Sequence, residues 1–152
     1  MRKQRFVSTL LVLIAVFMVN GTAFADTVIA PERTQGLVAP ATQATHNLVT
    51  LRGPGKFVAA EISKQGGTND LTFVSLDIDG KNVVNASIAA LNNWALTQQN
   101  PYGIVLLKSP AGIQTVTIGY PSTLAFKKGL NLSVTVKEPN VVQIIGNVIH
   151  GK

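Results

Sequence analysis

The chain contains no cysteine, and this absence sets the first limits on the protein. Disulfide bonds, thiol nucleophiles, thiolate metal ligands and a lipoprotein attachment point are all excluded. Stability must therefore come from an ordinary apolar core. With 152 residues, the chain is long enough to bury one such core, so we expect a single folded domain.

Charge is also scarce, because Asp, Glu, Lys and Arg together make up 13% of the residues. The net charge is +6, from 13 basic and 7 acidic residues. Without Arg2, Lys3 and Arg5 in the leader described next, the count is 10 against 7, a net charge of +3. The remaining cations are scattered, whereas a nucleic-acid-binding protein needs a dense basic stripe. We therefore expect no nucleic-acid partner.

No apolar run reaches the roughly 20 residues that a membrane-spanning helix needs. Residues 6–19 form a shorter apolar stretch after the three basic residues, and Ala23-Phe24-Ala25 has the small-x-small pattern of a signal peptidase site. An uncleaved membrane anchor is the alternative, but Asn20 and Gly21 interrupt the stretch. We expect residues 1–25 to be a signal peptide, and the mature protein to begin at Asp26. It would then be periplasmic or extracellular, with no stable membrane insertion.

Residues 26–45 are rich in Ala, Thr, Gln and Pro and contain few side chains large enough to fill a core. This composition does not offset the entropy of ordering the segment. We expect an extended N-terminal arm or spacer, with a short strand around residues 27–30. The alternative is that the segment pairs along a sheet edge, in this subunit or in another, where it would support self-association.

Residues 46–152 show the pattern of an all-β domain, because short β-branched runs alternate with Gly, Pro, Asn and Asp. In residues 71–79, Val74, Leu76 and Ile78 share the expected buried face, and Asp79-Gly80 predicts a hairpin turn. The expected strands are 48–51, 57–62, 71–79, 104–107, 114–120, 124–126, 130–136 and 141–149.

About nine strands without a long helix favour an antiparallel two-sheet β-sandwich, of jelly-roll or immunoglobulin-like type. The absence of cysteine favours the jelly roll, because immunoglobulin domains carry a Cys, Trp, Cys pattern. Residues 87–96 are the exception to the strand pattern. Ile88, Leu91 and Ala95 have helical spacing and predict one or two turns crossing an end of the sandwich.

Few residues suggest catalysis. Asp77 and Asp79 resemble the start of a calcium loop or a glycosidase carboxylate pair, but no Glu stands at the twelfth position of such a loop. Their alternation with Leu76 and Ile78 predicts a solvent-facing strand instead. Neither histidine is accompanied by a nucleophile motif. The sequence also contains no phosphate-loop motif. We expect no enzyme activity, no cofactor and no metal, and surface positions for His46 and His150.

Residues 92–102 are the best candidate for ligand binding, because aromatic and amide side chains alternate there. Trp and Tyr offer a flat apolar face with a polar tip, and Asn or Gln donates and accepts hydrogen bonds. These are the residue types that hold a sugar ring. The alternative is that the single Trp fills the core and the amides belong to a solvated loop. The candidate ligand-binding residues are Trp94, Tyr102, Asn92, Asn93 and Gln98.

Two functions from different classes fit the sequence. The first is a secreted, non-enzymatic binding module that recognises a glycan or another surface polymer. The second is a structural subunit of an extracellular or envelope assembly, in which residues 26–45 add a strand to a neighbouring sheet edge.

Overall fold

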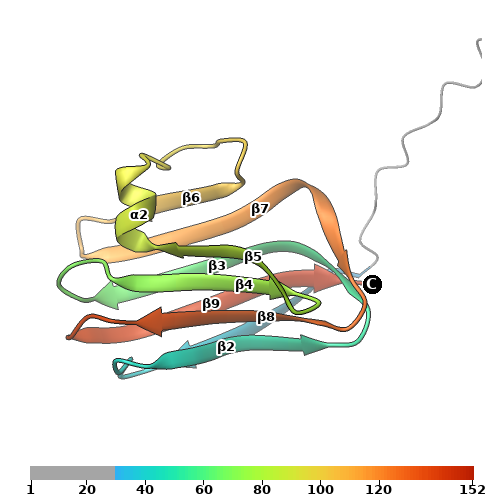
Figure 1. Ribbon diagram of the computed structural model, residues 1–152, viewed down its shortest axis with the longest axis horizontal. Coiled ribbons are helices and arrows are strands. Elements are labelled where there is room, and N and C mark those ends of the chain that lie inside the picture. The colour runs from blue at the N-terminus through green and yellow to red at the C-terminus, as the bar shows by residue number, and fades with distance from the viewer. Residues whose placement is uncertain (1–29) are drawn as a thin grey trace, which may run out of the picture.

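The computed structural model describes residues 30–152, and Figure 1 shows their arrangement as two packed β-sheets. The expected signal peptide (1–25), its cleavage site and residues 27–29 of the expected first strand lie outside the described residues. One sheet has five strands in the order β1-β9-β3-β7-β6, and the other has four in the order β2-β8-β4-β5. The elements are β1 (Glu32–Val38), β2 (Thr45–Arg52), β3 (Gly55–Gly66), β4 (Thr72–Ile78), β5 (Lys81–Ser87), α2 (Ile88–Asn93), β6 (Ile104–Lys108), β7 (Ile113–Phe126), β8 (Gly129–Val136) and β9 (Val141–Gly151).

The strand pairing identifies the sandwich as a jelly roll. Four antiparallel pairs join β1 with β9, β2 with β8, β3 with β7 and β4 with β5. The chain therefore folds like one long hairpin wound around the core, and the β3–β9 and β4–β8 ladders bring neighbouring pairs together. This is jelly-roll connectivity, with β6 as an additional edge strand on β7. The sandwich prediction is confirmed, and the immunoglobulin-like alternative is wrong.

The core lies between the two sheets and follows the expected alternation. Val74, Leu76 and Ile78 of β4 are buried, as are the residues of the same parity on β8. Each fully buried aliphatic side chain contributes about 1.5–3 kcal/mol. The predicted hairpin is also confirmed, because Asp79 and Gly80 have φ of 54° and 78° between the paired strands β4 and β5.

Part of the segment expected to form an arm is a strand of this domain's own sheet. Residues 32–38 form β1, which pairs with β9 from Glu32 opposite His150 to Val38 opposite Ile144. This is the sheet-edge alternative, realised within the same chain. Pairing with a strand more than a hundred residues away supplies the hydrogen bonds that the local composition does not predict.

Two other elements differ from the sequence expectation. β5 was not expected as a strand, because it contains Asn82 and Asn85 and asparagine is depleted in strands. Residues 114–120 and 124–126 were expected as separate strands but belong to one, β7. The register against β3 jumps between Phe57 and Ala59, so a bulge accommodates the residues that had indicated a break.

The expected helix is present as α2, which carries the chain from β5 of one sheet to β6 of the other (Figure 1). Ser87 caps its first turn by accepting a hydrogen bond from Ala90 N–H at 3.0 Å. Ile88 and Leu91 are fully buried, so the helix covers the core between the edge strands β5 and β6. Within residues 30–152, no helix is long and apolar enough to cross a membrane.

Candidate functional site

The C-terminal end of α2 presents Trp94 to solvent. Trp94 is the C-cap residue, and its backbone N–H donates to Ala90 O at 2.9 Å. Ala95 follows with φ of 53°, and its N–H donates to Asn92 O at 3.0 Å. These bonds fix the chain direction at the helix end. The Trp94 side chain is 62% exposed, so the core alternative for this residue does not apply.

Hydrogen bonds of the Asn100 side chain hold Tyr102 in the following loop. The Asn100 side-chain amide donates to Gln98 O at 2.9 Å and to Ile104 O at 2.7 Å, and its Oδ1 accepts from Tyr102 N–H at 3.0 Å. One side chain thus joins both sides of the turn before β6. Tyr102 is 69% exposed.

Trp94 and Tyr102 line one surface depression together with Leu96 and Ile104. Its volume is about 560 Å³, and its lining is mainly apolar. Leu96 is buried beneath it and is fixed by a hydrogen bond of 2.7 Å from Leu106 N–H to Leu96 O. The two aromatic residues singled out from the sequence are therefore brought together around one depression.

The three candidate amides are exposed but do not line this depression. Asn92 and Asn93 lie in the last turn of α2, and Gln98 lies in the loop that follows. The structure thus groups the aromatic residues of the candidate site and leaves Asn92, Asn93 and Gln98 in the surrounding solvent-exposed segments.

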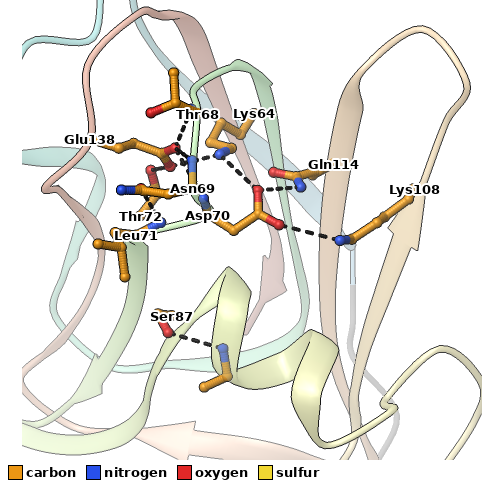
Figure 2. A network of polar contacts seen from close by, with 11 residues as sticks. Lys64, Thr68, Asn69, Asp70, Leu71, Thr72, Ser87, Lys108, Gln114 and Glu138 are labelled. Carbon is orange, nitrogen blue, oxygen red and sulfur yellow. Dashed lines mark hydrogen bonds and ion pairs between the residues drawn. The ribbon is translucent and has the colours of Figure 1, made fainter.

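A polar cluster that the sequence did not predict surrounds the buried Glu138 (Figure 2). Its Oε1 accepts from Lys64 Nζ and from Thr72 Oγ1, both at 2.7 Å. Its Oε2 accepts backbone N–H groups of Thr68 at 2.8 Å and of Asn69 at 3.1 Å, and also that of Asp70. One carboxylate thereby holds the whole turn between β3 and β4.

Asp70 extends this cluster toward β6 and β7 (Figure 2). Its carboxylate lies 3.5 Å from Lys64 Nζ and 3.2 Å from Lys108 Nζ, and it accepts a hydrogen bond from Gln114. Two cations and two carboxylates balance within the cluster. Its connections run between strands and turns of the protein itself, which is the arrangement of a structural clamp.

The clamp keeps both carboxylates ionised. Burial would raise the pKa of Glu138, but hydrogen bonds from Lys64, Thr72 and the Asn69 backbone, together with the Lys64 charge, hold it below its ordinary value of 4.5. Burial also opposes ionisation of Asp70. The Gln114 and Lys108 contacts outweigh it and lower the Asp70 pKa below 3.8.

Asp77 and Asp79 have structural roles. Asp77 lies on the outer face of β4, as predicted, and accepts a hydrogen bond from Asn82 at 2.9 Å. Asp79 accepts backbone N–H groups of Lys127 at 2.9 Å and Lys128 at 2.7 Å, and it holds the turn between β7 and β8. These hydrogen bonds lower the pKa of Asp79.

The histidines also contact the protein itself. His46 Nε2 lies 2.8 Å from Thr42 O, and His150 Nε2 lies 2.8 Å from Thr34 Oγ1. Among the described residues, no three His, Asp or Glu side chains are grouped so as to hold a metal ion. In comparisons with known proteins, no family model matches the chain, and no curated protein matches it significantly.

Proposed function

We propose that the protein is an exported, non-enzymatic recognition module that binds a glycan or another surface polymer at Trp94 and Tyr102. The observation that carries the proposal is the exposure of both aromatic side chains around one depression. Full burial of a tryptophan removes roughly 150–250 Å² from water and contributes about 4–6 kcal/mol at 25 cal/mol per Å². The fold forgoes most of this contribution at Trp94.

The chemistry of the depression suits a sugar ring. The flat faces of Trp94 and Tyr102, which share their lining with Leu96 and Ile104, offer contact to the apolar face of a pyranose. Asn92, Asn93 and Gln98 lie on the adjoining helix and loop with exposed amides, which both donate and accept hydrogen bonds. Sugar hydroxyls need both kinds of partner.

The pKa values and positions of three carboxylates favour a binding function over acid catalysis. Asp70, Asp79 and Glu138 all have lowered pKa values and are held by hydrogen bonds from the protein itself. A general acid at neutral pH needs the opposite shift. None of the three lines the aromatic depression.

The alternative proposal, a structural subunit of an envelope assembly, depends on a free N-terminal arm. Residues 32–38 already pair with β9 of the same sheet, so they have no need of a neighbouring sheet edge. This observation favours the binding module.

Trp94 supplies its own test, because it is the only tryptophan in the sequence and its fluorescence reports on the depression directly. We expect a soluble neutral polysaccharide to shift or quench the emission, and Trp94→Ala to weaken binding at least tenfold in calorimetry. Val142→Ala is the matched control, because Val142 is 56% exposed on β9 and belongs to a different surface. Equal binding by both variants, or a tryptophan emission that no polysaccharide alters, would overturn the proposal.

A further inference from the structure

The outer face of the four-stranded sheet carries uncharged amides and hydroxyls in register across its strands. Directly paired residues on neighbouring strands point to the same side of a sheet, so the ladders define three rows. We call the set the amide–hydroxyl face. It comprises Thr45 and Thr135 in the first row, Asn47, Ser133, Ser75 and Asn85 in the second, and Thr50, Asn131, Asp77 and Asn82 in the third. Ser133 belongs to this side by its register but is only 7% exposed.

This composition is not that of an ordinary solvated sheet. Asparagine is depleted in strands, yet four asparagines occupy outward positions on β2, β5 and β8. Asp77 is the only charged residue among the ten. Positions that break a local propensity rule in this way are expected where function requires them.

Hydrogen bonds within the face hold its side chains in place. Asn82 Nδ2 donates to Ser75 Oγ at 2.8 Å and to Asp77 Oδ1 at 2.9 Å. Thr50 Oγ1 donates to Asn131 Oδ1 at 2.9 Å, and Asn131 Nδ2 donates to Asn47 Oδ1 at 3.3 Å. Each amide has two donor hydrogens and two acceptor lone pairs, so these bonds leave capacity for a ligand. The groups are ordered before a ligand arrives, which lowers the entropy cost of binding.

The chemistry of the face selects among ligand classes. Nucleic acids require clustered cations, and protein interfaces favour aromatic residues and Arg at their centre over Ser. A lipid surface requires exposed apolar side chains. A polyhydroxylated polymer without charge matches the face, because its hydroxyls need donors and acceptors, and Asp77 is the one charged residue among the ten. Side chains recur across the strands about every 4.8 Å, which presents a repeating array to a repeating chain.

We propose that the amide–hydroxyl face binds an extended, uncharged polysaccharide lying flat on the four-stranded sheet. Phe73 lies in the first row on β4, and Lys137 Nζ lies 5.0 Å from the centroid of its ring. This second surface extends the proposed recognition function, but its residues are separate from those of the aromatic depression. Each surface can therefore fail or succeed alone.

The test uses Asn47→Ala combined with Asn85→Ala, which removes exposed amides from both edge strands of the second row. Gln35→Ala combined with Gln65→Ala is the matched control, because both are exposed amides on strands of the other sheet. The probes are cellulose, chitin and starch as neutral polymers and alginate as a charged one. We expect the first variant to bind a neutral polymer about tenfold more weakly, from the loss of two hydrogen-bonding groups, and the control to bind unchanged.

Three results would overturn the proposal: equal binding by the two double variants, preference for alginate, or no binding of any neutral polymer. A dimer that dissociates in the Asn47 and Asn85 variant would assign the face to self-association and would also overturn it. Asn85→Lys is the second variant, because it places a long charged side chain over the row if the double alanine variant does not fold. Loss of binding in Trp94→Ala alone, with the amide variant unaffected, would defeat this inference and leave the aromatic site standing.

Discussion

Lys64 and Glu138 are both buried, and charged side chains are tolerated in such positions only when they are paired. An isolated buried charge costs several kcal/mol, and here Glu138 Oε1 meets Lys64 Nζ at 2.7 Å while Oε2 meets three backbone N–H groups. An apolar pair of similar volume would avoid the cost of desolvating the ions. It would also leave the turn at residues 68–70 without its hydrogen-bond acceptor, so the carboxylate is required by the backbone as well as by the lysine.

The clamp gives the protein a defined sensitivity to acid. Because the pKa values of Glu138 and Asp70 are lowered in the folded state, the unfolded chain takes up protons first as the pH falls. We expect the free energy of unfolding to be steady above about pH 5 and to decrease as the pH falls below 4.5, the ordinary pKa of Glu138. Urea unfolding at a series of pH values measures this.

The Glu138→Gln variant isolates the contribution of Glu138 to stability and to its pH dependence from that of the other carboxylates. It leaves the buried Lys64 with only the more distant Asp70 carboxylate, at 3.5 Å, as a charged partner, so we expect a loss of about 3 kcal/mol at pH 7 and a flatter decrease below pH 4.5. Lys108→Met is the control, because the Lys108 pair with Asp70 is partly exposed and is worth at most about 1 kcal/mol. A Glu138→Gln variant with wild-type stability and pH dependence would remove the clamp from this account.

Residue types alone singled out Trp94 and Tyr102, and the structure places both at one depression, while their role in binding stays a proposal. Lys64 was missed. It shares the parity of Ile62 on β3, so the alternation points it inward, but the strand was expected to end at Ile62. The position of Glu138 could not be anticipated, because its partners lie about 70 residues away and are mostly backbone N–H groups.

At the scale of elements, β1 packs closely against the other sheet as well as pairing with β9. A Cβ atom at Gly36 would lie 1.8 Å from the backbone oxygen of Leu48 on β2. The strand at the edge of one sheet thus approaches the backbone of the other sheet, and only glycine permits the contact.

Gly36→Ala tests this approach. We expect it to displace β1 and to lower the free energy of unfolding by about 1–3 kcal/mol, the usual cost of overpacking. Gly119→Ala is the matched control, because its Cβ would meet only Ala59 Cβ at an ordinary 3.9 Å. Thermal unfolding measures the cost, and amide hydrogen exchange locates it. Equal stability of the two variants would mean that β1 adjusts freely.

Elements were predictable from the sequence where one face is buried and the other is solvated. The alternation in β4 and β8 revealed their inner faces because the sheet imposes a period of two on the side chains. β1 and β5 gave no such signal, since their stability comes from pairing with β9 and β4 rather than from their own composition. The bulge in β7 was hidden for a similar reason, because only the register against β3 joins its two halves.

At the scale of the whole molecule, short strands, turn residues and the missing cysteines predicted a sandwich and favoured the jelly roll, but they could not give the strand order. The order depends on pairings such as Glu32 with His150, which no local pattern encodes. The two candidate ligand surfaces also differ in whether a local pattern or long-range pairing reveals them. Aromatic residues close in sequence were recognised, whereas the amide–hydroxyl face combines four strands and became visible only from the ladders.

Export is a prediction about the whole chain and has a direct test. We expect the protein recovered from the periplasm or the medium to begin at Asp26, because the small-x-small pattern ends at Ala25. Intact mass spectrometry of the secreted protein measures its N-terminus. A full-length mass in the membrane fraction would support the uncleaved anchor instead.

The pairing of β1 with β9 also sets how the domain responds to a pulling force. Glu32 lies opposite His150, so the start of β1 and the end of β9 lie side by side at one end of the ladder. A load applied through these two points opens the ladder one rung at a time, like a zipper, and never stretches all its hydrogen bonds at once. A module tethered through both ends would yield at low force, whereas one tethered through a single end would transmit no tension across its sheets.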